Sequence, residues 1–259
     1  MNIKTIIIGF CSILFSLNTT SSDAQELRFT DILNEEKLID ENVMGKFIDH
    51  DFSSLWLQGE YVRGIIGEDY QRIRVKILNV VKNENNPKEY LVYGKTMVRS
   101  NICEFIGKIT IQEIQETDRD YFGVDDEYIG MTKTQGLITA TYELFEDKRQ
   151  EHTGVFLGKL KTKWYLDNNN EVHYDDINAV SDGYFNNSFV GNWKGYHSTK
   201  SKICNWADYR VPSVKFGFDI GAGEFSPDEA YANVGWESYI KMLSGDEQSK
   251  FEEQREWWK

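Results

Sequence analysis

The strict alternation of residues 72–77, which read Arg-Ile-Arg-Val-Lys-Ile, constrains the fold more than any other stretch of the chain. Successive side chains of a β-strand point to opposite faces, so this pattern places three apolar side chains on one face and three cations on the other. The stretch therefore predicts a strand with one buried face and one face toward solvent or a polar lumen.

A period of two begins at residue 55, and further strands are expected at residues 90–98, 102–114, 137–145, 155–166, 172–174 and 189–196. Hairpin-length turns rich in Asn and Asp separate several of them. Such a series predicts an antiparallel up-and-down meander, and closure into a barrel removes its exposed edges. The expected fold class is mainly β: a calycin-like β-barrel over residues 55–197.

The segments on either side of the expected barrel have different patterns. Residues 25–54 contain a helical candidate, with Thr30 as a possible N-cap and apolar residues at helical spacing. Residues 198–259 form a C-terminal extension with two short helices. The first follows Ser226-Pro227-Asp228-Glu229, which has an N-cap, a proline at N1 and two acids suited to the helix dipole.

The N-terminus has the pattern of a cleavable signal peptide. A basic residue, Lys4, precedes an apolar run over residues 6–17, and small residues lead to Ala24. The run is shorter than the roughly 20 apolar residues of a membrane-spanning helix. We expect cleavage near Ala24 and a secreted or periplasmic mature chain without a transmembrane segment, the alternative being an N-terminal anchor that stays attached.

The charge balance excludes some partners. The chain has 42 acidic and 29 basic residues and a formal net charge of −13, which disfavours nucleic acid and anionic membrane surfaces. Small molecules, glycans and envelope proteins remain as expected partners, and the oligomeric state stays open.

Two cysteines remain after the signal peptide, Cys103 and Cys204. An even count in an oxidising compartment predicts a disulfide between them, the alternative being two separate buried thiols. No metal or cofactor is expected, because the histidines lack ligand spacing. Residues 167–171 begin like a calcium loop, but Val172 and Asn178 stand where the loop needs Gly and Glu.

Two short motifs resemble the Gly-x-aromatic motif of calycin barrels, the lipocalin and avidin type: Gly59-x-Tyr61 and Gly191-x-Trp193. The resemblance implies a barrel with one end plugged by an aromatic side chain. Calycins carry the motif on their first strand, whereas the better match here lies on the last expected strand. This position would follow if the first and last strands lie side by side where the barrel closes.

A longer resemblance covers residues 174–177, 181–184, 191–193, 204–210, 219–225 and 235–236. These motifs resemble a family of secreted bacterial proteins that has no assigned activity. The resemblance therefore implies neither a reaction nor a ligand.

Three carboxylates near the C-terminus, Asp208, Asp219 and Glu224, could supply the acid and base of a glycosidase. The alternative is structural: Arg210 pairs with Asp208 or Asp219 and fastens the segment. We favour the structural interpretation, because structural ion pairs are commoner than catalytic ones.

An aromatic cluster in the same region could instead bind a ligand. Its candidate residues are Trp193, Tyr196, Trp206 and Tyr209, together with Arg210. Exposed on one surface, they would suit sugar rings or an apolar molecule. Buried, they would seal the C-terminal segment against the barrel.

The sequence leaves open whether the protein is an enzyme and favours a non-catalytic role. The first hypothesis is an exported module that binds a small apolar or glycan ligand or an envelope partner. A secreted hydrolase using the three carboxylates is the second, and a structural envelope or inhibitor protein is the third.

Overall fold

The computed structural model describes residues 27–33, 36–57, 59, 61–124 and 126–259. The expected signal peptide and its cleavage point near Ala24 lie outside these residues. Among the described helices, none has the length and apolar character needed to cross a membrane.

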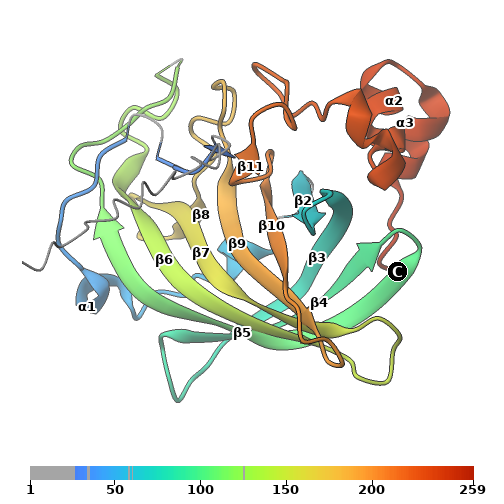
Figure 1. Ribbon diagram of the computed structural model, residues 1–259. Helices are drawn as coiled ribbons and strands as arrows, with labels where there is room; N and C mark the ends of the chain where they lie inside the picture. Colours follow the sequence, from blue (N-terminus) through green and yellow to red (C-terminus); the bar gives the residue numbers. More distant parts are fainter. Residues whose placement is uncertain (1–26, 34–35, 58, 60, 125) are drawn as a thin grey trace, which may run out of the picture.

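Eight antiparallel strands form a closed up-and-down barrel, which confirms the expected fold class (Figure 1). The strands are β2 (Val62–Ile66), β3 (Gln71–Lys82), β4 (Glu89–Val98), β5 (Asn101–Glu116), β6 (Thr132–Glu146), β7 (Gly154–Asp167), β9 (Asn186–Gly195) and β10 (Lys202–Asp208). Each strand pairs with its neighbour in the chain, and β10 pairs with β2 to close the barrel. The short β8 (Val172–Tyr174) pairs with the end of β7 beyond β9.

The closing strand β10 lies beyond residue 197, where the sequence pattern placed the end of the barrel. The first strand also begins later than expected, at Val62. Five consecutive residues of β10, from Cys204 to Asp208, are buried, because the barrel core covers one face and the N-terminal and C-terminal segments together cover the other. A strand buried on both faces loses the alternation of polar and apolar residues, so β10 has no period-two pattern.

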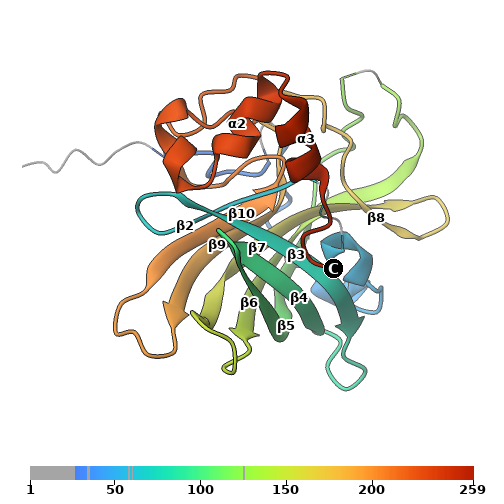
Figure 2. The same cartoon turned by 90° about the vertical axis from the view of Figure 1, so that its right-hand side faces the viewer.

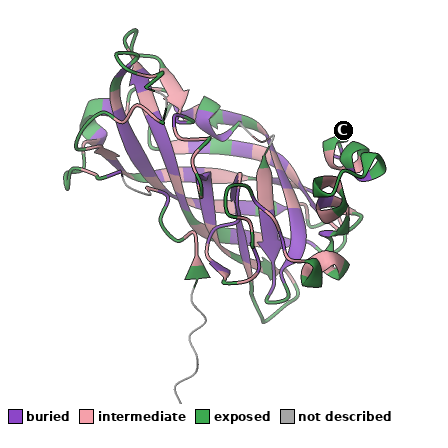
Figure 3. Cartoon of the chain, turned by 90° about the horizontal axis from the view of Figure 1, so that it is seen from above, coloured by how far each residue is buried: buried purple, intermediate pink, exposed green. Residues whose placement is uncertain are grey.

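The apolar residues of β3 point into the barrel, as their alternation with cations predicts. Ile73, Val75 and Ile77 are buried in the main core cluster. The core inside the barrel is filled by large side chains from many of its strands and from the N-terminal segment: Trp56, Tyr90, Phe105, Tyr142, Phe156, Trp164 and Trp206. Buried residues alternate mainly with residues of intermediate burial along much of the barrel wall, while exposed residues gather in the connections and helices (Figure 3).

The N-terminal segment plugs one end of the barrel. It is mostly irregular, with the short helices α1 (Met44–Phe47) and η1 (Ser53–Trp56) in place of the helix expected near Thr30. The rings of Phe47 and Phe52 pack edge-on against Trp164, with centroids 5.0 and 5.4 Å away. Before the plug, β1 (Leu27–Arg28) pairs with β11 (Val214–Lys215) outside the barrel.

The C-terminal segment packs against the outer surface of β2, β3 and β10 through a second apolar cluster that includes Tyr70, Phe218 and Trp236 (Figure 2). It contains η2 (Glu229–Val234), α2 (Glu237–Leu243) and α3 (Glu247–Gln254). A helical turn begins close to the expected start at residues 226–229, but it is a 3-10 helix and its N-cap is Asp228, two residues later than the pattern placed it. Asp228 caps it by accepting a hydrogen bond from the Ala230 amide, 2.9 Å away.

The expected disulfide is wrong: Cys103 and Cys204 are both buried free thiols. Cys103 lies on β5 and Cys204 on β10, and three strands separate β5 from β10 in either direction around the barrel. The two cysteines therefore lie on opposite walls of the barrel. A disulfide requires Cα atoms within about 7 Å, which the width of the filled core between the walls prevents.

Two adjacent valines on β3 test the register of the barrel. Val80 is buried in the core, whereas Val81 is 50% exposed on the outer surface. We expect Val80→Asp to lower the free energy of unfolding by several kcal/mol, because it buries a charge without a partner. The matched Val81→Asp change should stay within about 0.5 kcal/mol. Urea unfolding of both variants measures the difference, and equal losses would contradict this register.

Candidate functional site

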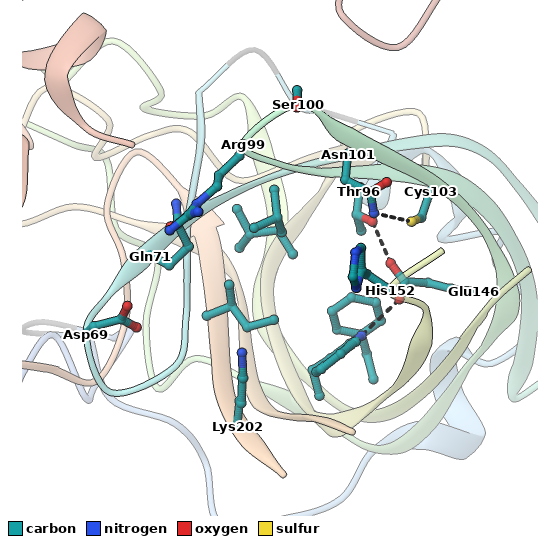
Figure 4. A pocket seen from close by; sticks show the side chains of 15 residues that line it. Asp69, Gln71, Thr96, Arg99, Ser100, Asn101, Cys103, Glu146, His152 and Lys202 are labelled. Atoms are coloured by element: carbon teal, nitrogen blue, oxygen red, sulfur yellow. Dashed lines mark hydrogen bonds between the residues drawn. The ribbon is translucent and has the colours of Figure 1, made fainter. Parts of the chain in front are cut away.

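The barrel end opposite the plug opens into a cavity of about 450 Å³ (Figure 4). The residues around it come from the β2–β3, β4–β5, β6–β7 and β9–β10 hairpins. Its floor is apolar and is formed by the last inward-facing side chains of the strands: Ile66, Ile73, Val98, Phe156 and Trp193. Thr96 and Cys103 also line the cavity, and their side chains are small, so they leave space that larger side chains would fill.

The buried carboxylate of Glu146 stands at one side of this cavity. It ends β6, and only 5% of the residue is exposed. Three donors from different strands converge on it: the Thr96 hydroxyl at 2.7 Å, the Trp193 indole Nε1 at 2.9 Å and the Gly154 amide at 2.9 Å. Burial raises the pKa of Glu146, and the three hydrogen bonds partly offset that effect.

Charged side chains surround the entrance. Arg99 occupies the tight β4–β5 turn with φ of 56° and donates from Nε to the Gln71 side-chain oxygen at 3.0 Å. Lys202 lies with its ammonium 5.8 Å from the centre of the Trp193 ring. Asp69 and His152 complete the charged or titratable part of the rim, as Figure 4 shows. The cavity thus joins an apolar floor to a polar entrance.

The thiol of Cys103 also lines the cavity, but its chemistry is unsuited to nucleophilic attack. Burial, with the nearby Glu146 charge, raises its pKa to about 11. The thiol therefore stays protonated near neutral pH, and a thiolate is the reactive form. The arrangement is equipped to hold a molecule by contact and hydrogen bonding.

The aromatic residues expected to bind a ligand do not form one surface. Of these, only Trp193 lines the cavity. Trp206 is packed in the core and stacks on Phe189 at 4.7 Å. Tyr196 donates to the Glu146 backbone carbonyl at 2.8 Å, while Tyr209 stacks on Tyr61 at 4.8 Å.

The three carboxylates considered for catalysis have separate surroundings. Asp208 is buried in the barrel and accepts hydrogen bonds from Tyr174 and Asn187, both at 2.8 Å. Asp219 is buried in an ion pair with Arg210 at 2.5 Å. Glu224 is exposed. This geometry supplies no pair of carboxylates facing one cleft.

Arg210 instead fastens the C-terminal segment, in agreement with the structural interpretation. Besides Asp219, its guanidinium donates to the backbone carbonyls of Ala222 and Gly223. The other Asp219 oxygen accepts from the amides of Gly221 and Ser226 at 3.1 and 3.0 Å. The pair therefore organises the loop between β11 and η2.

One group among the described residues could hold a metal ion: Asp167, Glu171 and His173, whose ligand atoms lie within 4.8 Å of one another. The group sits on the turn that begins like a calcium loop. Asp167 Oδ1 accepts from the amides of Asn169 and Glu171, which is the bonding of a tight turn.

Sequence reasoning missed Glu146. The sequence did contain an indication of this residue, because the alternation of residues 137–145 extends to residue 146. Leu144 points into the barrel, so the same period turns Glu146 inward as well. A carboxylate on the apolar side of an alternating strand marks an unusual buried charge.

The ion pair of Arg210 and Asp219 generates a stability test. Arg210→Ala leaves the buried Asp219 charge without its partner, so we expect the free energy of unfolding to fall by about 3–5 kcal/mol. Glu224→Ala, an exposed change in the same segment, should stay within about 0.5 kcal/mol. Chemical denaturation compares the two, and an unchanged stability for Arg210→Ala would refute the structural role.

Asp208 generates a pH test. Burial is the main reason why its pKa rises from 3.8 to about 6. The native state therefore binds a proton more readily than the unfolded chain, and its stability falls as the pH rises through this window. Asparagine does not titrate, so the variant Asp208→Asn should not lose this stability as the pH rises.

Relative to the wild type, Asp208→Asn should gain about 3 kcal/mol between about pH 4 and pH 7. Urea titrations across that range measure the change for both proteins. A stability difference that does not vary with pH would show that Asp208 titrates normally. Asp182→Asn, at an exposed aspartate, is the control.

Comparison of the chain with protein-family models, with curated proteins and with solved structures found no match. The two resemblances suggested by the sequence motifs thus identify no family. What the structure supports of them is the eight-strand antiparallel barrel itself.

Proposed function

We propose that the protein is a binding module that holds a small, partly apolar molecule in the open end of its barrel. The observation that carries the proposal is the cavity of about 450 Å³ beside the buried Glu146 carboxylate. Small-molecule sites are typically concave, mostly apolar and equipped with a few convergent polar groups. The barrel end is concave, and it joins an apolar floor to polar groups that converge at its side and rim.

The ligand that suits this cavity has an apolar body and a polar end. Its body would lie on Ile66, Ile73 and Phe156, and its polar end would meet the rim at Arg99 and Lys202. The carboxylate of Glu146 has already accepted three hydrogen bonds, so its position is fixed before a ligand arrives. A fixed polar group favours selectivity, because little ordering is needed on binding.

Non-catalytic binding is favoured over hydrolysis for two reasons. Asp208 and Asp219 are held by separate partners while Glu224 is exposed, and burial raises the pKa of the cavity thiol to about 11. We also propose export, which rests on residues 1–24 of the sequence. A calycin-like role would then place ligand capture outside the cytoplasm.

Binding of N-phenyl-1-naphthylamine, a neutral apolar dye whose fluorescence rises in apolar surroundings, tests the proposal. Val98→Trp places an indole in the cavity and should abolish the fluorescence gain. Ile102→Trp adds the same ring on the same hairpin, at a residue that is 37% exposed and absent from the cavity lining. This control should retain the wild-type gain.

Circular dichroism verifies that both variants remain folded. Dye binding that Val98→Trp and Ile102→Trp affect equally would contradict the proposed location. The absence of a fluorescence gain in the wild type would contradict an accessible apolar cavity.

A further inference from the structure

A second hollow lies outside the barrel, between the outer surface of β2–β3 and the C-terminal tail. It has a volume of about 630 Å³. Figure 2 shows α3 and the end of the chain beside β3. We call this hollow the tail groove. Its positively charged residues are Arg63, Arg72, Arg74, Lys76 and Arg255.

The tail groove concentrates positive charge on a protein whose net charge is −13. Two carboxylates take up part of it. Glu253 pairs with Arg72 at 2.5 Å and with Arg74 at 2.9 Å, while Glu252 pairs with Arg255 at 2.7 Å. The contacts with Arg72 and Arg74 attach the tail to the barrel wall, whereas the pair of Glu252 and Arg255 lies within the tail.

Two cations of the tail groove are left over. Within the described part of the chain, neither Arg63 nor Lys76 forms an ion pair with a carboxylate. The Nε of Arg63 is buried and lacks a hydrogen-bond partner there. Its Nη1 donates to the Val62 carbonyl at 3.1 Å, and a guanidinium has five N–H donors, so Arg63 retains donors for a further acceptor.

Electrostatic crowding supports the same conclusion. The pKa of Arg74 falls to about 10, mainly because of burial and secondly because of the neighbouring Arg72. A bound anion nearby would offset this lowering of the pKa, since an opposite charge favours the ionised guanidinium.

Aromatic rings position the two free cations. The guanidinium carbon of Arg63 lies 4.8 Å from the ring centre of Tyr239, and the Lys76 ammonium lies 5.1 Å from that of Trp258. Cation–π contacts hold both cations in place without supplying an anion, and their charges act at longer range on the buried Asp208, where they partly offset the rise of its pKa. Tyr61, which is 43% exposed, adds another aromatic ring to the groove.

We propose that the tail groove binds a small ring compound carrying a carboxylate, sulfate or phosphate group. The oxyanion would contact Arg63 and Lys76, because a guanidinium and an ammonium both donate charge-assisted hydrogen bonds to oxygen. The ring would lie against the aromatic side chains. This site is separate from the barrel cavity and does not depend on the function proposed for it.

Calorimetric titration with four sugars tests the proposal: glucuronate, glucose 6-sulfate, glucose 6-phosphate and neutral glucose. They share a ring and differ in the anionic group, so the series distinguishes carboxylate, sulfate and phosphate sources. We expect at least one anionic sugar to bind, with an affinity that falls as salt concentration rises. Glucose should bind at least tenfold more weakly.

Arg63→Gln and Lys76→Gln should each weaken that binding at least tenfold. Lys159→Gln removes the same charge from an exposed site on β7 and should leave the affinity unchanged. The dye should still bind the barrel cavity of all three variants, which separates this test from that of the proposed function.

Three outcomes would overturn the proposal. One is the absence of binding by all three anionic sugars. Another is equal weakening in Lys159→Gln and the two groove variants. The third is a lower melting temperature in Arg63→Gln and Lys76→Gln without any change in affinity, which would assign these cations a structural role only.

Discussion

The pairing of β2 with β10 is the contact on which the rest of the structure depends. β2 pairs with β10 over five residues but with β3 over only two, so β10 holds the first strand in the sheet. Gly64 makes this close approach possible, because a Cβ there would lie 2.9 Å from the Cβ of Trp206. Closure then places Trp206 in the core and removes both sheet edges.

The sequence could predict the barrel but not its closing strand. On β3, one face meets the core and the other carries cations, and the alternation revealed this arrangement. On β10, both faces are covered, so polar and apolar residues do not alternate along the strand. The separation of Cys103 from Cys204 was equally hidden, since cysteine count and compartment carry no information about which walls of a barrel two strands occupy.

The site was harder to predict than the fold. Trp193 was found because aromatic residues cluster near it in sequence, whereas Glu146 depends on partners from three other strands. The ion pair of Arg210 and Asp219 was foreseen as one of two pairings, and the structure selects it. Asp208 lies at the far end of the barrel interior, where only tertiary contacts with Tyr174 and Asn187 define its role.

The two unpaired thiols on opposite walls have a consequence for how the protein can be made. Since no covalent bridge links the described strands, the barrel relies on its strand pairing, packed core and ion pairs alone. Its folding therefore needs neither an oxidant nor a disulfide isomerase. The described fold therefore contains no disulfide that glutathione could reduce, in a reducing compartment or in an oxidising one.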